Sequence, residues 1–542
     1  MRSSVQLRRI CERVARQVNA PSRYYGPDVS GPGQIPCTLR LEWTIDVDSI
    51  GNIMRVAGLS VTSVSTLRHR FGRVRDTRLR LLHSSTRMQQ NPGNVREMPA
   101  EWLRRIIEDD TKPPKLYAWT PQNLSVGGGA EFESVKGART GSGTYGRGDD
   151  ERRRIFVLGI GNIGILYAIC LSRIANNPPP ITLVVHRREL LERWVAEPGI
   201  ELIRHGRAHR NAKFDIEWWT DTAPGRGHNT EVAAGRSISN LIVATKASIA
   251  LPQIDRIRRY LDSNSTVAFA QNGMCKLWPP VGDTYVRARF PDGTNPNWIA
   301  CVTTHGVTSQ GPFRSIHAAP ANALVGPVMS NGVDRTDEQI GYLMRQIASA
   351  PDLDARVVPR KELWIAQLEK LVVNAIINPL TAVLRCKNGE IFVPRDDGLP
   401  AVIDKLLTEA SKMLNTLIRD PASDGILNSD SLNQEATSDE VFESQGASRE
   451  QLLERFSFPR LRTMVLEVGA KVSANTSSML QDVRAGKPTE IDDFNGWLID
   501  MAKLLDKGLQ LPTHEKLIAL VKGQAVLTRG ELCAKLLAEN HS

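Results

Sequence analysis

Features of secreted, zinc-binding and membrane-spanning proteins are missing from this sequence of 542 residues. Its seven cysteines form no Cys-x-x-Cys pair and have no histidine partner at zinc-finger spacing, so the pattern indicates free thiols in a reducing compartment. The longest apolar stretch, residues 155–171, is interrupted by three glycines and an asparagine, which suits a strand, turn and helix better than a membrane span. We therefore expect no metal site and no transmembrane segment.

Lysine is absent from the first 88 residues, which contain 15 arginines. The first 26 residues hold six Arg and one acidic residue, and one face of a helix would carry the apolar side chains Leu7, Ile10, Val14 and Val18. This amphipathic, acid-poor pattern is typical of a mitochondrial presequence, so we expect the protein in the mitochondrial matrix. The alternative is a disordered basic tail on a cytoplasmic protein.

Positive charge is concentrated in the N-terminal part of the chain. Residues 1–150 hold 23 Lys and Arg against 15 Asp and Glu, whereas the remaining 392 residues hold 46 against 44. Most of the chain is therefore almost neutral, which argues against a nucleic-acid-binding core. A chain of this length also exceeds what one hydrophobic core can hold, so we expect two or three domains.

Composition divides the chain into an extension, a linker and two domains. Residues 1–120 are Arg-rich and poorly patterned, and residues 121–153 are rich in Gly and Ser, which predicts a flexible linker. Residues 154–330 alternate short β-branched runs with helical patterns, whereas residues 337–535 are helical nearly throughout. Within the helical part, residues 421–448 are rich in Ser, Asp and Glu, which predicts a disordered loop.

Five apolar runs, separated by helical patterns, predict a parallel β-sheet. The runs are IFVLGI (155–160), ITLVVH (181–186), LIVAT (241–245), TVAFAQ (266–271) and WIACVTT (298–304). Strands that alternate with helices in this way form βαβ units. The expected fold class is α/β followed by α: a Rossmann-like dinucleotide-binding domain and then an all-helical domain.

A glycine-rich turn follows the first of these runs and opens a helical pattern. It reads Gly159-Ile160-Gly161-Asn162-Ile163-Gly164. In a G-x-G-x-x-G turn the first glycine permits the bend, the second lets the backbone approach a pyrophosphate, and the third lets helix and strand pack closely. The strands and helix around it predict dinucleotide binding, with an ordinary Gly-rich turn as the alternative.

The end of the second predicted strand indicates which dinucleotide binds. NAD-specific sites place an acidic residue there to hold the ribose 2′-hydroxyl, but this chain has His186-Arg187-Arg188. A guanidinium binds a 2′-phosphate bidentately, whereas a carboxylate would repel it. We therefore predict NADPH/NADP as the cofactor, although solvated surface charge also explains these arginines.

Lys370, Asn374 and Asn378 recur every four residues, on one face of a strongly apolar helix. A cation and two amides on a buried helix are costly unless they face a polar cavity or find partners. A polar site explains them, but amides bonded to neighbouring backbone and a lysine that reaches solvent explain them equally well. Pro379 is predicted to end or kink the helix.

A second polar cluster lies farther along the chain, around Asn475 and Ser478. Ser478 and Gln481 fit a capping box, which is a sufficient structural explanation of that serine. After a break at residues 486–488, Glu490 is predicted in the first turn of the next helix, where the helix dipole favours a carboxylate.

Taken in order, several runs resemble the ketopantoate reductase family. They are VLGIGNIG (157–164), ATKA (244–247), QNGM (271–274), TTHG (303–306), EKLVVNAIINPLTAVLRCKNGE (369–390) and SSMLQDVRAGKPTEIDDFNG (477–496). The last two are long and specific, and the resemblance extends from about residue 154 to residue 530. Residues 1–150 match nothing in the family's common core.

The resemblance implies roles for individual residues. The catalytic residues fall on Lys370 and Glu490. Cofactor contacts fall on the glycine loop (Gly159, Ile160, Gly161, Asn162, Ile163 and Gly164) and on Arg187, Lys246, Asn272, Val307 and Glu490. Substrate contacts fall on Asn272, Asn374, Asn378, Asn388, Asn475 and Ser478.

The activity that the resemblance implies is NADPH-dependent reduction of 2-dehydropantoate (ketopantoate) to pantoate, in pantothenate and coenzyme A biosynthesis. Lys370 would donate the proton to the oxygen as hydride reaches C2. One alternative is reduction of another 2-keto acid on the same fold, and a second is a non-catalytic mitochondrial protein that serves RNA or ribosomes. The expected partner is a small 2-keto acid, no nucleic acid is expected, and a homodimer stays open.

Overall fold

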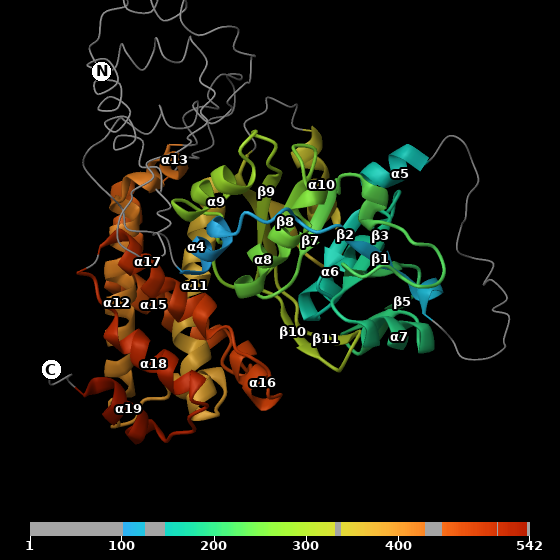
Figure 1. Ribbon diagram of the computed structural model, residues 1–542. Coiled ribbons are helices and arrows are strands. Elements are labelled where there is room, and N and C mark those ends of the chain that lie inside the picture. The colour runs from blue at the N-terminus through green and yellow to red at the C-terminus, as the bar shows by residue number, and fades with distance from the viewer. Residues whose placement is uncertain (1–100, 125–146, 331–337, 429–446, 507, 539–542) are drawn as a thin grey trace, which may run out of the picture. The chain divides into compact units, whose positions relative to one another are not determined.

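The computed structural model (Figure 1) describes most of the chain from residue 101 onward, in residues 101–124, 147–330, 338–428, 447–506 and 508–538. The predicted presequence, most of the Gly/Ser-rich linker and the middle of the predicted loop at 421–448 lie outside the described residues. The structure therefore bears on the two predicted domains and on the segment directly before them.

A nine-stranded sheet forms the centre of the first domain, with strands in the order β1-β6-β3-β2-β7-β8-β9-β12-β13. Five of its strands coincide with the five predicted runs: β2 (Ile155–Leu158), β3 (Ile181–Val185), β7 (Asn240–Val243), β8 (Thr266–Phe269) and β9 (Asn297–Thr303). These strands run parallel to one another, and all their residues are buried. The predicted Rossmann-like domain is confirmed.

Helices cover both faces of this sheet, which is why its central strands are continuously apolar. On one face Ile155 and Val157 share a core with α6 (Asn162–Ser172) and α10 (Glu338–Ser349). On the other face Phe156 and Leu158 share a core with α8 (Ala247–Ile257) and α9 (Val281–Arg289). Alternate residues of β2 thus serve the two cores, as the two-residue period of a strand requires.

The outer strands are not evident from the sequence. β6 (Asp215–Thr220) runs parallel to β3, β12 (Ala323–Met329) antiparallel to β9, and β13 (Ala355–Val357) parallel to β12. A second sheet has the order β10-β11-β4-β5. Its strands are β10 (Gly306–Ser309), β11 (Arg314–Ala319), β4 (Ile200–Arg204) and β5 (Arg207–Asn211).

The second domain is built around α11 (Arg360–Leu384), a helix of 25 residues. It contacts α12 (Leu399–Arg419), α15 (Phe458–Lys471), α16 (Ser478–Arg484) and α18 (Pro512–Lys522). Further helices are η6 (Asn388–Phe392), α14 (Arg449–Arg455), the π-helix η9 (Asp492–Gly496), α17 (Trp497–Leu505) and α19 (Arg529–Leu537). The predicted helical domain is confirmed, with the short strand β13 as an exception near its start.

Pro379 does not end α11, contrary to one of the two outcomes predicted for it. The helix continues to Leu384, and the left-handed residue Arg385 (φ 55°) follows it. A proline has no N–H, so it cannot donate to the carbonyl four residues before it. That carbonyl belongs to Ala375, and it accepts a hydrogen bond of 2.9 Å from Asn495 Nδ2 instead. A side chain from another segment thus replaces the missing backbone donor.

The N-terminal segment before residue 120 is not wholly an extension, so that predicted boundary is wrong. Residues 101–124 form α4 (Glu101–Glu108), β1 (Tyr117–Trp119) and η3 (Pro121–Asn123). β1 pairs antiparallel with β6 and becomes the outermost strand of the large sheet. Three residues give too short a pattern to predict, because the strand is specified by its distant partner.

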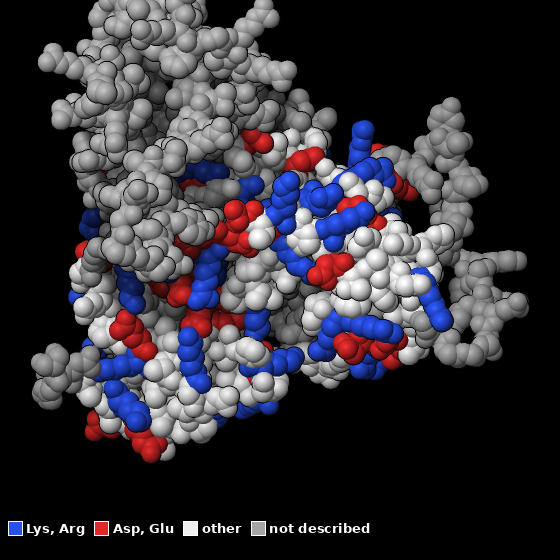
Figure 2. Space-filling view, viewed as in Figure 1, with Lys and Arg blue, Asp and Glu red and all other residues white. Residues whose placement is uncertain are grey.

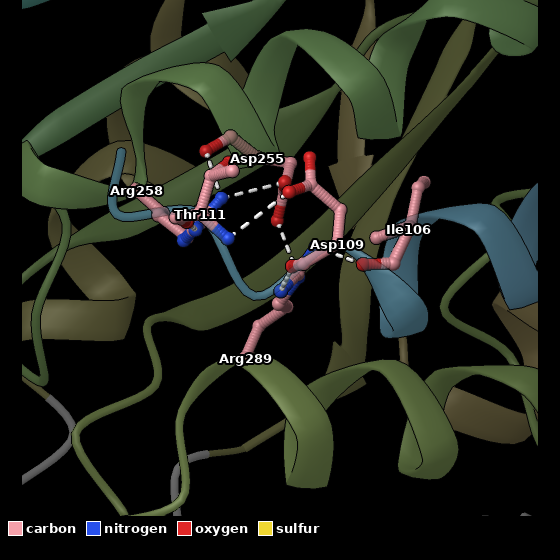
Figure 3. A network of polar contacts seen from close by, with 6 residues as sticks. All are labelled: Ile106, Asp109, Thr111, Asp255, Arg258 and Arg289. Atoms are coloured by element: carbon pink, nitrogen blue, oxygen red, sulfur yellow. Dashed lines mark hydrogen bonds and ion pairs between the residues drawn. The ribbon is translucent and has the colours of Figure 1, made fainter. Parts of the chain in front are cut away.

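Two arginines bond the end of α4 to the first domain (Figure 3). Arg289 donates to the carbonyl oxygens of Ile106 and Asp109, and Arg258 donates to that of Thr111. Both arginines are held by Asp255, at N–O distances of 2.9 Å and 2.6 Å. The bond to Ile106 satisfies one of the carbonyl groups that a helix end leaves without intrahelical partners.

Two other predicted boundaries also need correction. The predicted linker at 121–153 ends in a helix, α5 (Arg147–Arg153). The predicted loop at 421–448 begins with the helical segments η7 (Pro421–Ser423) and α13 (Asp424–Leu427). Ser423 and Ile426 are almost fully buried there, because they pack against α12 and neighbouring helices.

The described residues contain no helix that is long and apolar enough to cross a membrane. All five cysteines within them are free. On the face shown in Figure 2, Lys and Arg side chains lie among Asp and Glu side chains over both domains. This mixture agrees with the nearly balanced charge of the sequence after residue 150.

Candidate active site

The glycine-rich turn lies between β2 and α6, as its sequence predicts. Gly159 has φ +98°, and a β carbon there would lie 2.9 Å from Thr245 Cγ2. A β carbon on Gly164 would lie 2.0 Å from the Gly159 carbonyl oxygen, so only glycine allows this packing. A β carbon on Gly161 would meet no atom within 4 Å. The turn therefore leaves open space before the first N–H groups of α6, which fits a pyrophosphate.

Asn162, the first residue of α6, ties this turn to the second sheet. Its Nδ2 donates to the carbonyl oxygen of Val307 in β10 at 3.3 Å, and its Oδ1 accepts from Ser315 Oγ in β11 at 2.9 Å. Two predicted cofactor residues, Asn162 and Val307, are thus in direct contact. The amide uses both of its ends and holds β10 beside the turn.

Arg187 and Arg188 follow β3 and are both well exposed. Arg188 bonds Glu192 at 2.8 Å and lies 6.0 Å from the ring centre of Trp119. Arg187 exposes 57% of its side chain, and its nearest ion-pair distance, to Glu189, is 4.0 Å. Arg187 therefore keeps a guanidinium available to an anion, whereas Arg188 is already engaged.

Lys246 joins the two domains. It precedes α8, and its Nζ donates to Asp482 Oδ2 at 2.8 Å and to the carbonyl oxygen of Pro488. Both acceptors belong to the helical domain, on either side of the break after α16. The predicted cofactor lysine thus lies at the domain junction, and one of its acceptors, Pro488, precedes Glu490 by two residues.

Asn272 connects the two predicted catalytic residues. Its Oδ1 accepts a hydrogen bond of 2.9 Å from Lys370 Nζ, and its Nδ2 donates to Glu490 Oε2 at 3.3 Å. Lys370 also donates to the carbonyl oxygen of Thr303, at the end of β9, at 2.5 Å. The donors and acceptors therefore fix the orientation of the amide and place an ammonium and a carboxylate on its opposite ends.

Burial affects both ionisable groups of this network. It lowers the pKa of Lys370 to about 8, and the nearby Glu490 carboxylate opposes this shift. Burial also raises the pKa of Glu490, which is only 8% exposed, and Lys246 acts in the opposite direction. The lysine is therefore mostly protonated at neutral pH but is a stronger acid than an ordinary lysine, which suits a group that gives up a proton.

The asparagines of α11 extend this polar face along the helix. Asn374 is partly exposed, one turn after Lys370. Asn378 is buried, and its Nδ2 donates to Ser478 Oγ at 3.4 Å. Three of the predicted residues therefore lie along one stripe that ends at the start of α16.

The predicted capping box at Ser478 is wrong by one residue. Ser477 is the N-cap of α16, and its Oγ accepts from the N–H of Leu480 at 3.1 Å. Ser477 also lies 2.7 Å from Thr381 Oγ1 of α11. Because Ser477 does the capping, the exposed Ser478 hydroxyl faces Asn378 instead.

Asn388 and Asn475 form a second pair beyond the end of α11. The N–H of Asn388 donates to the carbonyl oxygen of Asn475 at 3.0 Å. Asn388 is 6% exposed, and its Oδ1 has no hydrogen-bond partner among the described residues. Asn475 is exposed. The structure joins these two residues through backbone atoms and does not bond either of them to Lys370.

Several groups of this site were not predicted. The Thr303 carbonyl and Asp482 lie in runs that the sequence analysis singled out, but nothing in their residue types marks them as partners of Lys370 and Lys246. Asn495 is buried and bonded to α11. Its one sequence signal is a polar residue in an apolar helical pattern, opposite a helix with an internal proline.

A parallel sheet with a glycine-rich turn, joined to a helical domain that supplies a lysine and a buried carboxylate, defines a two-domain oxidoreductase dependent on a nicotinamide dinucleotide. The chain belongs to the ketopantoate reductase family, whose members reduce small 2-keto acids. The family model "Ketopantoate reductase PanE/ApbA" matches residues 155–330, and its C-terminal model matches residues 362–525. The recognition of this family from the sequence is confirmed.

Among the relatives, two fungal proteins are similar over almost their whole length. Ketoisovalerate reductase BEA2 of Gibberella fujikuroi is 42% identical over 452 residues, which cover 80% of this chain and 98% of that protein. Ketoisovalerate reductase of Beauveria bassiana is 40% identical over 462 residues, with the same coverage. The probable 2-dehydropantoate 2-reductase of Schizosaccharomyces pombe is 29% identical over 306 residues, covering 54% of this chain and 76% of that protein.

The coverage also bears on the segment before the family core. Eighty per cent of the chain is about 434 residues, whereas residues 154–542 number 389, so the first similarity includes part of the chain before residue 154. This agrees with the place of α4 and β1 inside the first domain.

Proposed function

We propose that this protein reduces the 2-oxo group of 2-ketoisovalerate, or of a closely similar branched 2-keto acid, with NADPH. The observation that carries the proposal is the network in which Asn272 holds Lys370 and Glu490 next to the dinucleotide-binding domain. The choice of substrate is supported by similarity over 98% of the length of two ketoisovalerate reductases. Ketopantoate, which the sequence analysis put first, becomes the second candidate.

In the proposed reaction Lys370 is the general acid. The bound dinucleotide would supply hydride to C2 of the keto acid, and the ketone oxygen would take a proton from the Lys370 ammonium, which gives the 2-hydroxy acid. A pKa of about 8 keeps this ammonium protonated at neutral pH and still acidic enough to donate. Thr303 and Asn272 orient it, because each accepts one of its hydrogen bonds.

The amides of α11 would bind the substrate without adding charge. Asn374 and Asn378 follow Lys370 along the same helical face, and Ser478 closes that face at the start of α16. Neutral donors in these positions would hold the carboxylate and orient C2 for hydride transfer. A keto acid with a short branched side chain would then lie between them and Asn272.

The preference for NADPH rests on the end of β3. No carboxylate stands at the position that binds a ribose 2′-hydroxyl in NAD-specific sites, and Arg187 offers an exposed guanidinium there. We therefore expect Arg187 to bind the 2′-phosphate.

Ketopantoate remains the second candidate because of Glu490. Ketopantoate carries a hydroxymethyl group that 2-ketoisovalerate lacks, and a buried carboxylate is a suitable acceptor for its hydroxyl. In this chain, however, Glu490 already accepts from Asn272. The 29% identity to the probable 2-dehydropantoate 2-reductase gives this candidate weaker support.

Initial rates of NADPH oxidation with 2-ketoisovalerate, ketopantoate and unbranched 2-keto acids test the proposal. We expect the highest kcat/KM with 2-ketoisovalerate, above ketopantoate by roughly 10-fold or more, as one extra group in a fitted pocket commonly costs. A higher kcat/KM with ketopantoate would favour the second candidate. No turnover with any 2-keto acid would contradict the function itself and would favour the non-catalytic alternative.

A further inference from the structure

Asn495 is a buried residue to which the proposed reaction assigns no role. Its side chain is completely buried. Its Nδ2 donates to the carbonyl oxygen of Ala375 at 2.9 Å, in the middle of α11. That carbonyl lacks its ordinary helical donor because Pro379 has no N–H. A proline inside α11 therefore creates an acceptor, and one side chain from a distant segment fills it.

A second contact fixes the same amide from the other side. Asn495 Nδ2 lies 2.9 Å from His514 Nδ1, and His514 Nε2 lies 3.0 Å from the carbonyl oxygen of Leu406. The carbonyl can only accept, so Nε2 carries the proton and Nδ1 accepts from the amide. Burial lowers the pKa of His514 to about 4, which keeps this arrangement at neutral pH. Asn495 thus donates both of its N–H groups.

The hydrogen bond between Asn495 and Ala375 lies close in the chain to both predicted catalytic residues. Ala375 follows Lys370 by five residues on α11, and Asn495 follows Glu490 by five residues through the π-helix η9. The same π-helix also packs against the loop of Asn272, since a β carbon on Gly273 would lie 3.0 Å from the Asp493 carbonyl oxygen. Movement of η9 against α11 would therefore displace Glu490 from Lys370.

We propose that Asn495 is a positioning residue, which sets the register between α11 and η9 and so holds Glu490 and Asn272 against Lys370. The proposal rests on the proposed function, because it assigns Asn495 an effect on that reaction. The proposal also explains why α11 contains Pro379. With an ordinary residue at 379, the Ala375 carbonyl would already have a backbone donor, and the link between the two segments would lose its specificity.

The competing explanation is that Asn495 only satisfies buried polar atoms. Removing a partner of a buried carbonyl destabilises a protein in either case. The two explanations predict different results when the Ala375 carbonyl regains a backbone donor. Pro379→Ala restores an N–H at position 379, which can bond the Ala375 carbonyl within α11 and needs no contact with η9.

The experiment compares wild type, Asn495→Ala, Pro379→Ala and the double variant, in kcat and in Tm. We expect N495A to lower both, with kcat down by about 10²-fold, the cost of misplacing reacting groups by about 1 Å. In the double variant Tm should regain at least half of the decrease that N495A causes. Its kcat, in contrast, should stay well below that of P379A. Recovery of kcat together with Tm would show a purely structural role and overturn the proposal. If N495A does not fold, the comparison of the double variant with P379A decides alone.

Ser411→Ala is the matched control. Ser411 Oγ donates to the carbonyl oxygen of Phe456 at 2.8 Å in the same domain, and its loss also leaves a buried carbonyl without a donor. We expect S411A to lower Tm and to keep the kcat of wild type. A fall in kcat as large as that of N495A would mean that general loosening of the domain explains both results.

A measurement without substrate keeps this inference separate from the proposed function. Acetic anhydride modifies the neutral amine of Lys370, so the pH dependence of modification, followed by mass spectrometry, reports its titration. In wild type the midpoint should lie at about 8. In the double variant it should move up toward the ordinary lysine value, because water would enter a misaligned site. An unchanged midpoint would contradict the proposal even if wild type reduced no 2-keto acid.

Discussion

Arg187 exposes 57% of its side chain, whereas Glu490 exposes 8%. This difference separates the two halves of the candidate site. The nucleotide-binding half offers backbone N–H groups and exposed cations, which bind an anion by attraction and need little support. The helical half offers an ammonium and a carboxylate that both bond the amide of Asn272 and whose pKa values are shifted by burial. Changes in the first half should therefore affect KM, and changes in the second should affect kcat.

The largest effect is expected at Lys370. Lys370→Ala removes the proton donor, so kcat should fall by roughly 10²- to 10⁴-fold, the range for a positioned general acid. The affinity for NADPH, measured by fluorescence titration, should change little, because that ligand is assigned to the other half. Lys370→Arg should recover little activity, since a guanidinium is a much weaker acid and has a different shape. Near-normal turnover of K370A would overturn the assigned role.

The pH dependence of kcat sharpens the comparison. A general acid works only when protonated, so reduction should slow as pH rises through about 8, the pKa of Lys370. Glu490 raises that pKa, so Glu490→Gln should move the fall in rate to lower pH. It should also lower kcat by about 10-fold or more, because Asn272 loses a charged acceptor. Profiles of kcat for wild type and E490Q check both statements, and a shift to higher pH would contradict them.

A smaller effect, on the binding half, is expected at Arg187. Arg187→Ala should raise KM for NADPH by about 10-fold, the worth of one charge-assisted hydrogen bond to a phosphate. Neither kcat nor KM for NADH should change much. Arg188→Ala is the matched control and should have less effect, because Arg188 is already bonded to Glu192. Equal kcat/KM for the two dinucleotides in wild type would refute the preference for NADPH.

The smallest effect is expected at the N-terminus of the chain. All the site groups described above lie within residues 101–538, after the Arg-rich segment. Removal of residues 1–95 should therefore leave kcat and both KM values within about two-fold of wild type. Steady-state kinetics of the shortened protein check this. A loss of more than 10-fold would assign the Arg-rich segment a part in the reaction.

Much of the sheet could be predicted, because strands buried on both faces leave continuous apolar runs such as residues 155–160 and 298–304. The glycine turn could be predicted for a similar reason, since its glycines meet steric limits that act within a few residues. The strand β1 could not, because it is short and its partner β6 lies far along the chain. The strands β4 and β5 pair with each other across a two-residue turn, but β5 (RAHRN) has no apolar run that would mark it as a strand.

The candidate site, like the sheet, could be predicted only in part from the sequence. The spacing of Lys370, Asn374 and Asn378 marks one helical face, but only the family resemblance connected that face with Glu490. The link through Asn272 depends on how two domains pack, so no local pattern contains it. Asn495 was missed because its partner is a carbonyl group, and the sequence does not tell which carbonyls lack a donor.

The short strand β1 (Tyr117–Trp119) has one more consequence, for solubility. The edge of a sheet carries unpaired N–H and C=O groups that can pair with a second molecule, and proteins often protect such edges with a very short strand. β1 pairs with the last three residues of β6, which include Trp218 and the buried Trp219. A protein shortened to begin at residue 154 would keep every residue of the candidate site and would expose this aromatic edge. We expect it to aggregate through strand-to-strand pairing.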